Sequence, residues 1–495
     1  MGGLRILVAL ALEITILSIC SVSAKPVFNT SEIEGSGAEV IFCDLDGRHS
    51  KDIVLVDGLN LCIFFQEAKG FSRGPQQRHQ LDKRPSLLWP ARLGKMGDSL
   101  LLMTSDGVTE LYFTNRTSPP AQRQILKQKT IVPESLEKPE AKCFPLSANT
   151  TGGSSLIIVP VADGLQIWRH DESWHQAQFL ERAVEAHLYP SIRDPGYNRT
   201  FDLQMSIGDL NGDGREDLIV MRNERGGMEH YSIYLQQTNG LFGVEPAFIY
   251  TNKADWRTAL SWIDINRDGK VDLIRNTFLD EAFFVPGMRS GKVLVGVHLA
   301  GEEGRIPPEP QHVFRKHDWS SALPLVDVDG DGFLDMVVGY IPINPREARK
   351  AITAQQIDFN LKFYFFRAGT GFQKEPDCEH DVLLHFNNEL LFTTERRLYY
   401  EQFINLNGDF NGDGKKDLLA KDHKDEISVY FFMSREKGFS READLRFKCP
   451  EPIDWWEVRD INGDGISDLV LKLQGQKIIR LFTSQRHEAG VRSGR

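Results

Sequence analysis

Five segments of this 495-residue sequence carry oxygen-bearing side chains at one fixed spacing. Each reads D-x-[DN]-x-D-G-x-x-D, with side-chain oxygens at loop positions 1, 3, 5 and 9. A backbone carbonyl at position 7 would add another oxygen, and glycine at position 6 permits the sharp turn that aims successive side chains inward. The candidate ligand positions are, loop by loop, Asp209, Asn211, Asp213, Arg215 and Asp217; Asp264, Asn266, Asp268, Lys270 and Asp272; Asp327, Asp329, Asp331, Phe333 and Asp335; Asp409, Asn411, Asp413, Lys415 and Asp417; and Asp460, Asn462, Asp464, Ile466 and Asp468.

This arrangement suits a calcium ion. Ca²⁺ accepts six to eight oxygen ligands in irregular geometry, whereas Mg²⁺ demands a near-ideal octahedron. The first half of the motif is similar to an EF-hand loop, but position 12 is Val220 in the first copy instead of Glu, and strand-like segments flank the loop. Asp-Gly stretches also form plain turns. Five copies, each with Asp at position 9, favour metal binding, so the sequence predicts about five structural Ca²⁺ ions.

The charge balance agrees with that prediction. The chain has 58 basic and 69 acidic residues, a formal net charge of −11. Five divalent ions would add +10 and bring the total to −1, so metal sites account for most of the acid excess. The sequence contains no Lys/Arg-rich run, which argues against nucleic acid as a partner.

An earlier segment keeps only part of the motif. Asp44, Asp46 and Asp52 occupy positions 1, 3 and 9, but position 5 is Arg48. A guanidinium at that point could replace the cation by pairing with the carboxylates. The two units that follow lack the ligands altogether.

The loops belong to a unit that recurs eight times, with motif starts near residues 44, 97, 153, 209, 264, 327, 409 and 460. Each loop runs into an apolar strand, a turn and a second, aromatic-rich strand, and a Gly-Phe pair such as Gly371-Phe372 often closes the unit. The 42 glycines and 23 prolines fit many short strands joined by turns. The spacing is close to that of propeller blades. We therefore predict an all-β fold, a β-propeller of four-stranded blades, with eight blades favoured and seven as the alternative.

Strand order within a unit is predicted as A, metal loop, B, turn, C, connector and D. The eighth unit ends with strand C at residues 478–482, so residues 26–33 are expected to supply its missing D strand and close the ring. An open solenoid would instead expose its terminal units. The same order puts Cys43 and Cys62 on strands A and C of one blade, with strand B between them, so they should not form a disulfide.

Residues 1–24 are typical of a signal peptide. Arg5 precedes an apolar stretch, and Ala24 ends a run of small residues that suits cleavage. Lipidation at Cys20 and an uncleaved anchor are the alternatives. Residues 25–495 are predicted to form a single propeller without a transmembrane segment. The expected location is secreted or extracellular, or periplasmic in a Gram-negative bacterium.

The loops, followed by a hairpin and Gly-Phe, resemble FG-GAP/VCBS repeats, which occur in the integrin α-chain propeller and in many secreted bacterial proteins. The likeness covers residues 37–483. It implies a propeller of seven or eight blades with structural Ca²⁺ in the blade loops, usually serving adhesion or ligand binding. No literal Gly-Ala-Pro occurs and no transmembrane segment follows, so the resemblance is to the repeat and not to one protein.

Chain direction divides the loops between two faces. The A–B and C–D loops share one face, and the B–C turns and D–A connectors share the other. Long B–C turns are expected at 223–230, 278–292 and 340–360, the last with a short helix beginning at Asn344 and Pro345. Aromatic residues are expected near the same face, namely Phe201, Trp256, Trp319 and Trp455. This face is the predicted site for an extracellular protein or glycan partner, although the rings could instead pack between blades.

Motifs of common enzymes are absent: the chain has no G-x-S-x-G, H-E-x-x-H or P-loop, and its 13 histidines are scattered. We therefore expect a binding or adhesion module and not an enzyme. A hydrolase or lyase with its active site at the mouth of the central channel, or a purely structural envelope protein, are the alternatives.

Overall fold

The computed structural model describes residues 26–485 except 36–38, 84, 94–96, 132–141, 144–146, 150–154, 162, 171–173, 182–187, 190–199, 202–203, 225–227, 254–257, 279–281, 286–287, 291–292, 302–304, 316–324, 341–343, 386–402 and 451–452. Residues 1–24, the predicted signal peptide, lie outside this part of the chain. The described regular elements are strands, apart from helix α1 (Pro345–Ala354).

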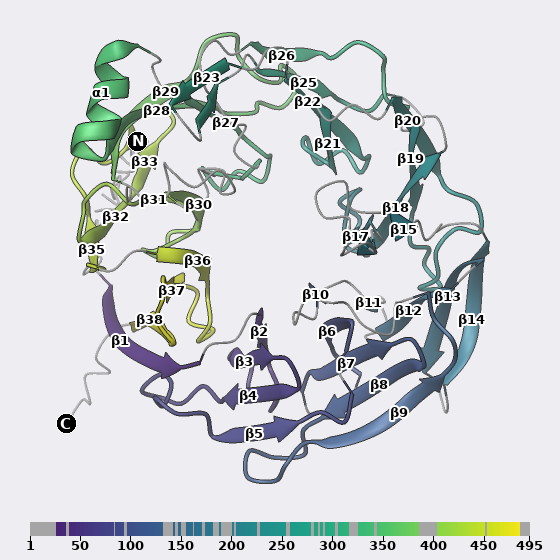
Figure 1. Ribbon diagram of the computed structural model, residues 1–495. Helices are drawn as coiled ribbons and strands as arrows, with labels where there is room; N and C mark the ends of the chain where they lie inside the picture. Colours follow the sequence, from purple (N-terminus) through teal and green to yellow (C-terminus); the bar gives the residue numbers. More distant parts are fainter. Residues whose placement is uncertain are drawn as a thin grey trace, which may run out of the picture.

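Antiparallel sheets follow one another around a ring and form the eight blades of a β-propeller (Figure 1). Blades 1 to 4 are β2 (Glu39–Cys43), β3 (Asp52–Asp57), β4 (Asn60–Phe64) and β5 (Gln77–Gln80); β6 (Leu87–Ala91), β7 (Ser99–Thr104), β8 (Gly107–Tyr112) and β9 (Ala121–Lys127); β11 (Ser147–Asn149), β12 (Ser155–Val161), β13 (Gly164–His170) and β14 (Trp174–Glu181); and β17 (Gln204–Gly208), β18 (Asp217–Glu224), β19 (Met228–Tyr234) and β20 (Phe248–Lys253). The predicted A-B-C-D order is confirmed in each of them.

Blades 5 to 8 continue the ring. They comprise β21 (Thr258–Ile263), β22 (Asp272–Phe278), β25 (Val293–His298) and β26 (His312–Arg315); β27 (Met336–Tyr340), β28 (Gln356–Tyr364) and β29 (Cys378–His385); β30 (Ile404–Gly408), β31 (Asp417–Ala420), β32 (Glu426–Tyr430) and β35 (Leu445–Lys448); and β36 (Ile453–Arg459), β37 (Asp468–Leu473), β38 (Ile478–Gln485) and β1 (Val27–Glu34). In blade 6 the described part of the inner strand is a single bridge between Val326 and Asp335.

Short accessory strands lie between the blade strands. They are β10 (Lys142–Cys143), which runs parallel to β6, and the pairs β15 (Leu188–Tyr189) with β16 (Thr200–Phe201), β23 (Ala282–Val285) with β24 (Met288–Ser290), and β33 (Phe432–Ser434) with β34 (Gly438–Phe439).

The core lies between neighbouring blades. Strand β3 is an unbroken apolar run, Ile53 to Val56, and each of these side chains is buried because a blade packs on both faces. One cluster joins Val54 of blade 1 to Leu100 of blade 2, and another joins Val429 of blade 7 to Leu469 of blade 8. Outer strands such as β5 alternate between half-buried and exposed side chains. Each blade is therefore held by its two neighbours, which makes the ring a stiff support for its loops.

The ring closes as the sequence predicts. Strand β1 pairs antiparallel with β38, with Val27 opposite Gln485 and Glu34 opposite Ile478, and the two lie side by side in Figure 1. Ile33 of β1 is fully buried in a cluster that joins blades 8 and 1. This outer strand completes the eighth blade, so the eight-bladed prediction is confirmed.

Two further predictions are confirmed. Strand β3 lies between β2 and β4, which carry Cys43 and Cys62, and both cysteines are free thiols. Helix α1 begins where predicted, because the Asn344 side chain accepts hydrogen bonds from the amides of Arg346 and Glu347, both at 3.0 Å. Among the described residues no helix has the length and apolar character needed to cross a membrane.

Candidate metal centres

The five predicted loops connect the inner strand A to strand B in blades 4 to 8. Position 9 begins strand B in four of the blades and directly precedes β27 in blade 6. Glycine at position 6 is needed in each loop, since its φ lies between 80° and 96°, in the left-handed region that other residues rarely adopt; Gly214, at φ 80°, is the first example.

Hydrogen bonds within each loop turn the side chains of positions 1, 3 and 5 towards the loop backbone. In blade 4 the Asp209 carboxylate accepts the amides of Asp213 at 3.1 Å and Gly214 at 2.9 Å. The position 3 side chain accepts the position 5 amide, and the position 5 carboxylate accepts the position 7 amide, in all five loops. The oxygens are therefore gathered by the local backbone before any partner is considered.

The position 9 aspartates also accept backbone hydrogen bonds, a structural role that the sequence did not predict. All five are fully buried, and both oxygens of each accept backbone amides. For Asp335 the donors are Val328 at 2.9 Å and Phe366 at 3.0 Å, so one carboxylate ties the A–B loop to the end of strand C. Equivalent pairs of bonds are made by Asp217, Asp272, Asp417 and Asp468.

Burial disfavours the ionised form of these carboxylates. It raises the pKa of Asp335 and Asp417 to about 8, that of Asp272 to about 7, and that of Asp217 and Asp468 to about 6, although the backbone donors oppose the shift. Neighbouring loop carboxylates raise these pKa values further. A cation among them would offset both effects, since an opposite charge favours the ionised form.

Blade 6 provides the test of whether the residues fit such a cation. One carboxylate oxygen from each of Asp327, Asp329 and Asp335 lies within 4.8 Å of the other two. Asp327 Oδ1 is buried without a hydrogen-bond partner. A buried anionic oxygen with no donor is costly, and beside two more carboxylates it fits a hard cation. The other four loops have Asn at position 3, so fewer carboxylates gather there.

The position 7 residues entered the prediction through their backbone carbonyls. Their side chains make other contacts. Arg215 pairs with Asp213, and Lys270 Nζ lies 3.4 Å from Asp268 Oδ2. The Lys415 ammonium lies 5.9 Å from the centre of the Phe432 ring. Phe333 and Ile466 carry no charge to offer.

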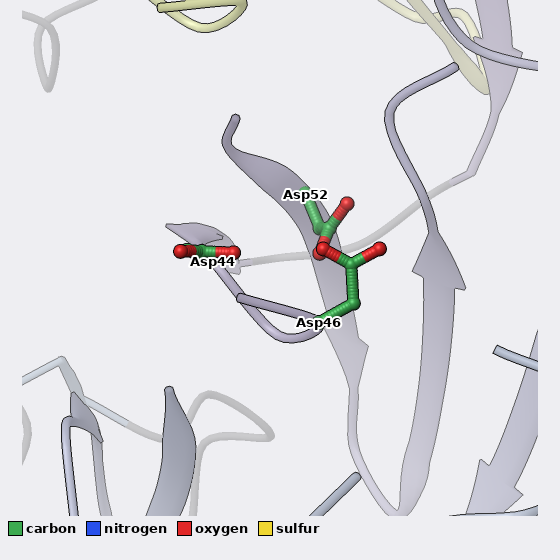
Figure 2. A group of neighbouring side chains, drawn as sticks. All are labelled: Asp44, Asp46 and Asp52. Carbon is green, nitrogen blue, oxygen red and sulfur yellow. The ribbon is translucent and has the colours of Figure 1, made fainter. Parts of the chain in front are cut away.

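One more group of three carboxylates comes together in the described part of the chain. One carboxylate oxygen from each of Asp44, Asp46 and Asp52 of blade 1 lies within 4.8 Å of the other two. Figure 2 shows these three side chains. This is the segment in which Arg48 occupies position 5 of the motif.

The predicted aromatic site is only partly within the described residues. Trp256 and Trp319 lie outside them, and Phe201 belongs to the short strand β16. Trp455 lies on the inner strand β36, half-buried against the cluster that joins blades 8 and 1, which is the packing role that the sequence left open. Of the long B–C turns, 278–292 contains β23 and β24, and 340–360 contains α1.

A cavity that sequence reasoning missed lies where the ring closes. Its volume is about 590 Å³, and residues of β1, blade 1 and the β37–β38 turn line it. Arg73 pairs with Glu34 at 2.8 Å at its edge, and Arg78 donates to the Cys62 thiol at 3.3 Å. No motif in the sequence marks it, because its lining combines residues 34–35 and 55–78 with residues 476–478 from the other end of the chain.

Comparison with known proteins agrees with this architecture. A family model for an FG-GAP-like repeat matches residues 209–274, which contain the loops of blades 4 and 5. Integrin alpha-PS3 of Drosophila melanogaster is 27% identical over 178 residues, covering 32% of this chain and 15% of that protein. The chain thus corresponds to a small part of its relative's length. The matched loop recurs in five blades of an eight-bladed ring, an arrangement that fits an FG-GAP repeat protein.

Proposed function

We propose that this protein is a secreted, calcium-stabilised propeller that acts as a non-catalytic binding or adhesion module for an extracellular protein or glycan. The observation that carries the proposal is the set of five oxygen-lined loops on one face of a stiff, closed ring of FG-GAP repeats. Similarity to a segment of an integrin α chain supports the adhesion role. In this proposal residues 1–24 direct export and residues 25–495 form the propeller.

Calcium would be held by positions 1, 3, 5 and 9 of each loop together with the position 7 carbonyl. Bound Ca²⁺ supplies positive charge that offsets the repulsion among these carboxylates. The chain itself does the positioning, because the position 9 aspartates already join the A–B loop to strand C within each blade. The loops therefore serve stability, and ligand recognition falls to another surface.

The face opposite the loops is the proposed partner site. Chain direction brings the B–C turns there, including helix α1 and the β23–β24 hairpin. The lining of the closure cavity includes the B–C turns of blades 1 and 8 and the D–A connector at Gly35, together with strand residues and Arg73 of a C–D loop. Variable loops on a rigid scaffold are where binding residues concentrate.

Substituting Asp331 by alanine should remove one ion from the total of about five, because position 5 supplies a side-chain oxygen to the blade 6 loop. Calcium bound per chain is measured by atomic emission after gel filtration. The control is Asp106→Ala. Asp106 pairs with Lys83 and Lys129 and lies in the B–C turn of blade 2, outside the five candidate metal loops. A full complement of ions in the Asp331 variant would contradict the assignment of that loop.

The double substitution Trp256→Ala with Trp319→Ala should abolish partner binding and leave the calcium content and the circular dichroism unchanged. Partners are first sought with the secreted protein on a glycan array and in a pull-down from extracellular matrix. Undiminished binding by the folded variant, or a partner that maps to the metal-loop face, would reject this surface. Unfolding of the variant would show that the two rings serve blade packing.

A further inference from the structure

The incomplete loop of blade 1 retains the backbone of a metal loop. Position 4 is Gly47 at φ 74°, and position 6 is His49 at φ 68°, a conformation that residues other than glycine rarely adopt. The His49 amide donates to Asp44 Oδ2 at 3.1 Å, and Asp52 accepts the amides of Leu45 and Gln66. Three converging aspartates on such a backbone would suggest a sixth ion (Figure 2).

Arginine side chains already face these carboxylates. Arg116, from the C–D loop of blade 2, pairs through Nε with Asp46 Oδ2 and donates through Nη2 to the Gln66 carbonyl at 2.8 Å. Its guanidinium lies 5.2 Å from the centre of the Phe65 ring, and only 22% of its side chain is exposed. Arg48 Nε lies 3.4 Å from the same Asp46 oxygen, but that side chain is 66% exposed.

Arg92 is the third arginine near these carboxylates, with its Nη1 at 3.9 Å from Asp44 Oδ2. Asp44 Oδ1 is buried without a hydrogen-bond partner, and this oxygen, like the loop backbone and the three converging carboxylates, favours an ion. Against it stand the missing oxygen at position 5 and three guanidinium groups within reach of two carboxylates. A divalent cation would be repelled by all three.

Blade 6 contains the same contact in a complete loop. Arg435, from the C–D loop of blade 7, pairs with Asp329 and Asp331 and lies 5.5 Å from the centre of the Phe365 ring. Both arginines thus come from the next blade and stack on the corresponding phenylalanine. The difference is in the acids and their pairs. The blade 6 loop offers four carboxylates, of which Arg435 pairs with two, and the Arg267 guanidinium lies beside Gly332. The blade 1 loop offers three carboxylates and adds pairs with Arg48 and Arg92.

We propose that Arg116 takes the place of a metal ion in blade 1, so that this blade is locked to blade 2 by a guanidinium and needs no calcium. The inference rests on the proposed calcium loops of blades 4 to 8 for its contrast, but not for the contacts of Arg116 itself. Blades 2 and 3 lack the motif, so the first three blades form a calcium-independent arc and the other five a calcium-dependent one.

Hydrogen exchange followed by mass spectrometry tests this on the full chain, with excess Ca²⁺ and with EGTA. In the wild type, chelation should raise exchange at least tenfold in segments 209–217, 264–272, 327–335, 409–417 and 460–468, and less than twofold in 44–52. Arg116→Ala should raise exchange in 44–52 in both conditions, and Ca²⁺ should not restore protection. Arg116→Lys should recover only part of it, because an ammonium lacks the planar fork that reaches both Asp46 and the Gln66 carbonyl.

Calcium counting provides a readout that does not depend on the Arg116 variants folding. Asp46→Ala should retain every ion bound by the wild type, whereas Asp329→Ala, at the matched position of blade 6, should lose one. Loss of an ion in the Asp46 variant, or deprotection of 44–52 by EGTA in the wild type, would overturn the proposal. If the wild type binds no calcium at all, the proposed function fails, but the exchange of 44–52 in the Arg116 variants still decides the role of the arginine.

Discussion

Chelation of calcium should lower the melting temperature of this protein by at least about ten degrees. A ligand that binds only the folded state stabilises it by RT ln(1 + [L]/Kd), which is about 2.7 kcal/mol at a hundredfold excess over Kd. The five loops lie in separate blades, so their contributions should be close to additive and together on the order of 10 kcal/mol. Without the ions, the buried position 9 carboxylates would face the other loop acids uncompensated.

Differential scanning fluorimetry with excess EGTA, followed by the return of Ca²⁺, measures this effect. Mg²⁺ at the same concentration is the control, because its demand for octahedral geometry should prevent it from restoring the full melting temperature. Equal melting temperatures and equal protease resistance with and without EGTA would show that the loops are plain turns.

Deleting residues 25–34 should prevent the formation of a stable ring. The deletion removes β1, strips blade 8 of its outer strand and exposes the edge of β38. It also removes the fully buried Ile33, whose loss alone costs about 2–5 kcal/mol when such a side chain is truncated to alanine. We expect aggregation or a loss of most of the stability, observed by size-exclusion chromatography and urea denaturation.

Point substitutions in the same strand provide the matched control. Ile33→Asp buries a charge between blades 8 and 1 and should come close to the effect of the deletion. Val27→Asp alters a side chain that is 46% exposed at the other end of β1 and should change the stability by less than about 0.5 kcal/mol. Similar effects of the two substitutions would mean that β1 acts only as a loose tail.

Local patterns explain what the sequence could predict. The positions of the A–B loops, the blade count, the strand order around Cys43 and Cys62 and the start of helix α1 all depend on residues within one unit, or on counting units around a ring. The closure could be predicted because the eighth unit lacked its D strand and residues 26–33 belonged to no other unit. The geometry of positions 1, 3 and 5 was accessible for the same reason, since the loop hydrogen bonds that these side chains accept join residues at most five positions apart.

Contacts between blades were beyond such reasoning. Arg116 and Asp46 are 70 positions apart, and Arg435 and Asp329 are 106 positions apart. Nothing in either segment marks the arginine, so the sequence suggested Arg48, which is nearer in the chain but largely exposed. Trp455 is a similar case, because its place on an inner strand depends on a boundary that a local pattern fixes only to within a few residues.

The pairing of β1 with β38 has a consequence for biosynthesis. Glu32 and its partner Arg480 are 448 positions apart, so a ribosome adding ~5–20 residues per second makes the second strand roughly half a minute to a minute and a half after the first. Over that interval Ile33 and the blade 1 residues Ile53 and Leu55 lack the blade 8 side chains that complete their cluster, among them Val470 and Ile479. A nascent or truncated chain should therefore keep this apolar surface and the edge of β1 exposed until β38 is made, which favours aggregation.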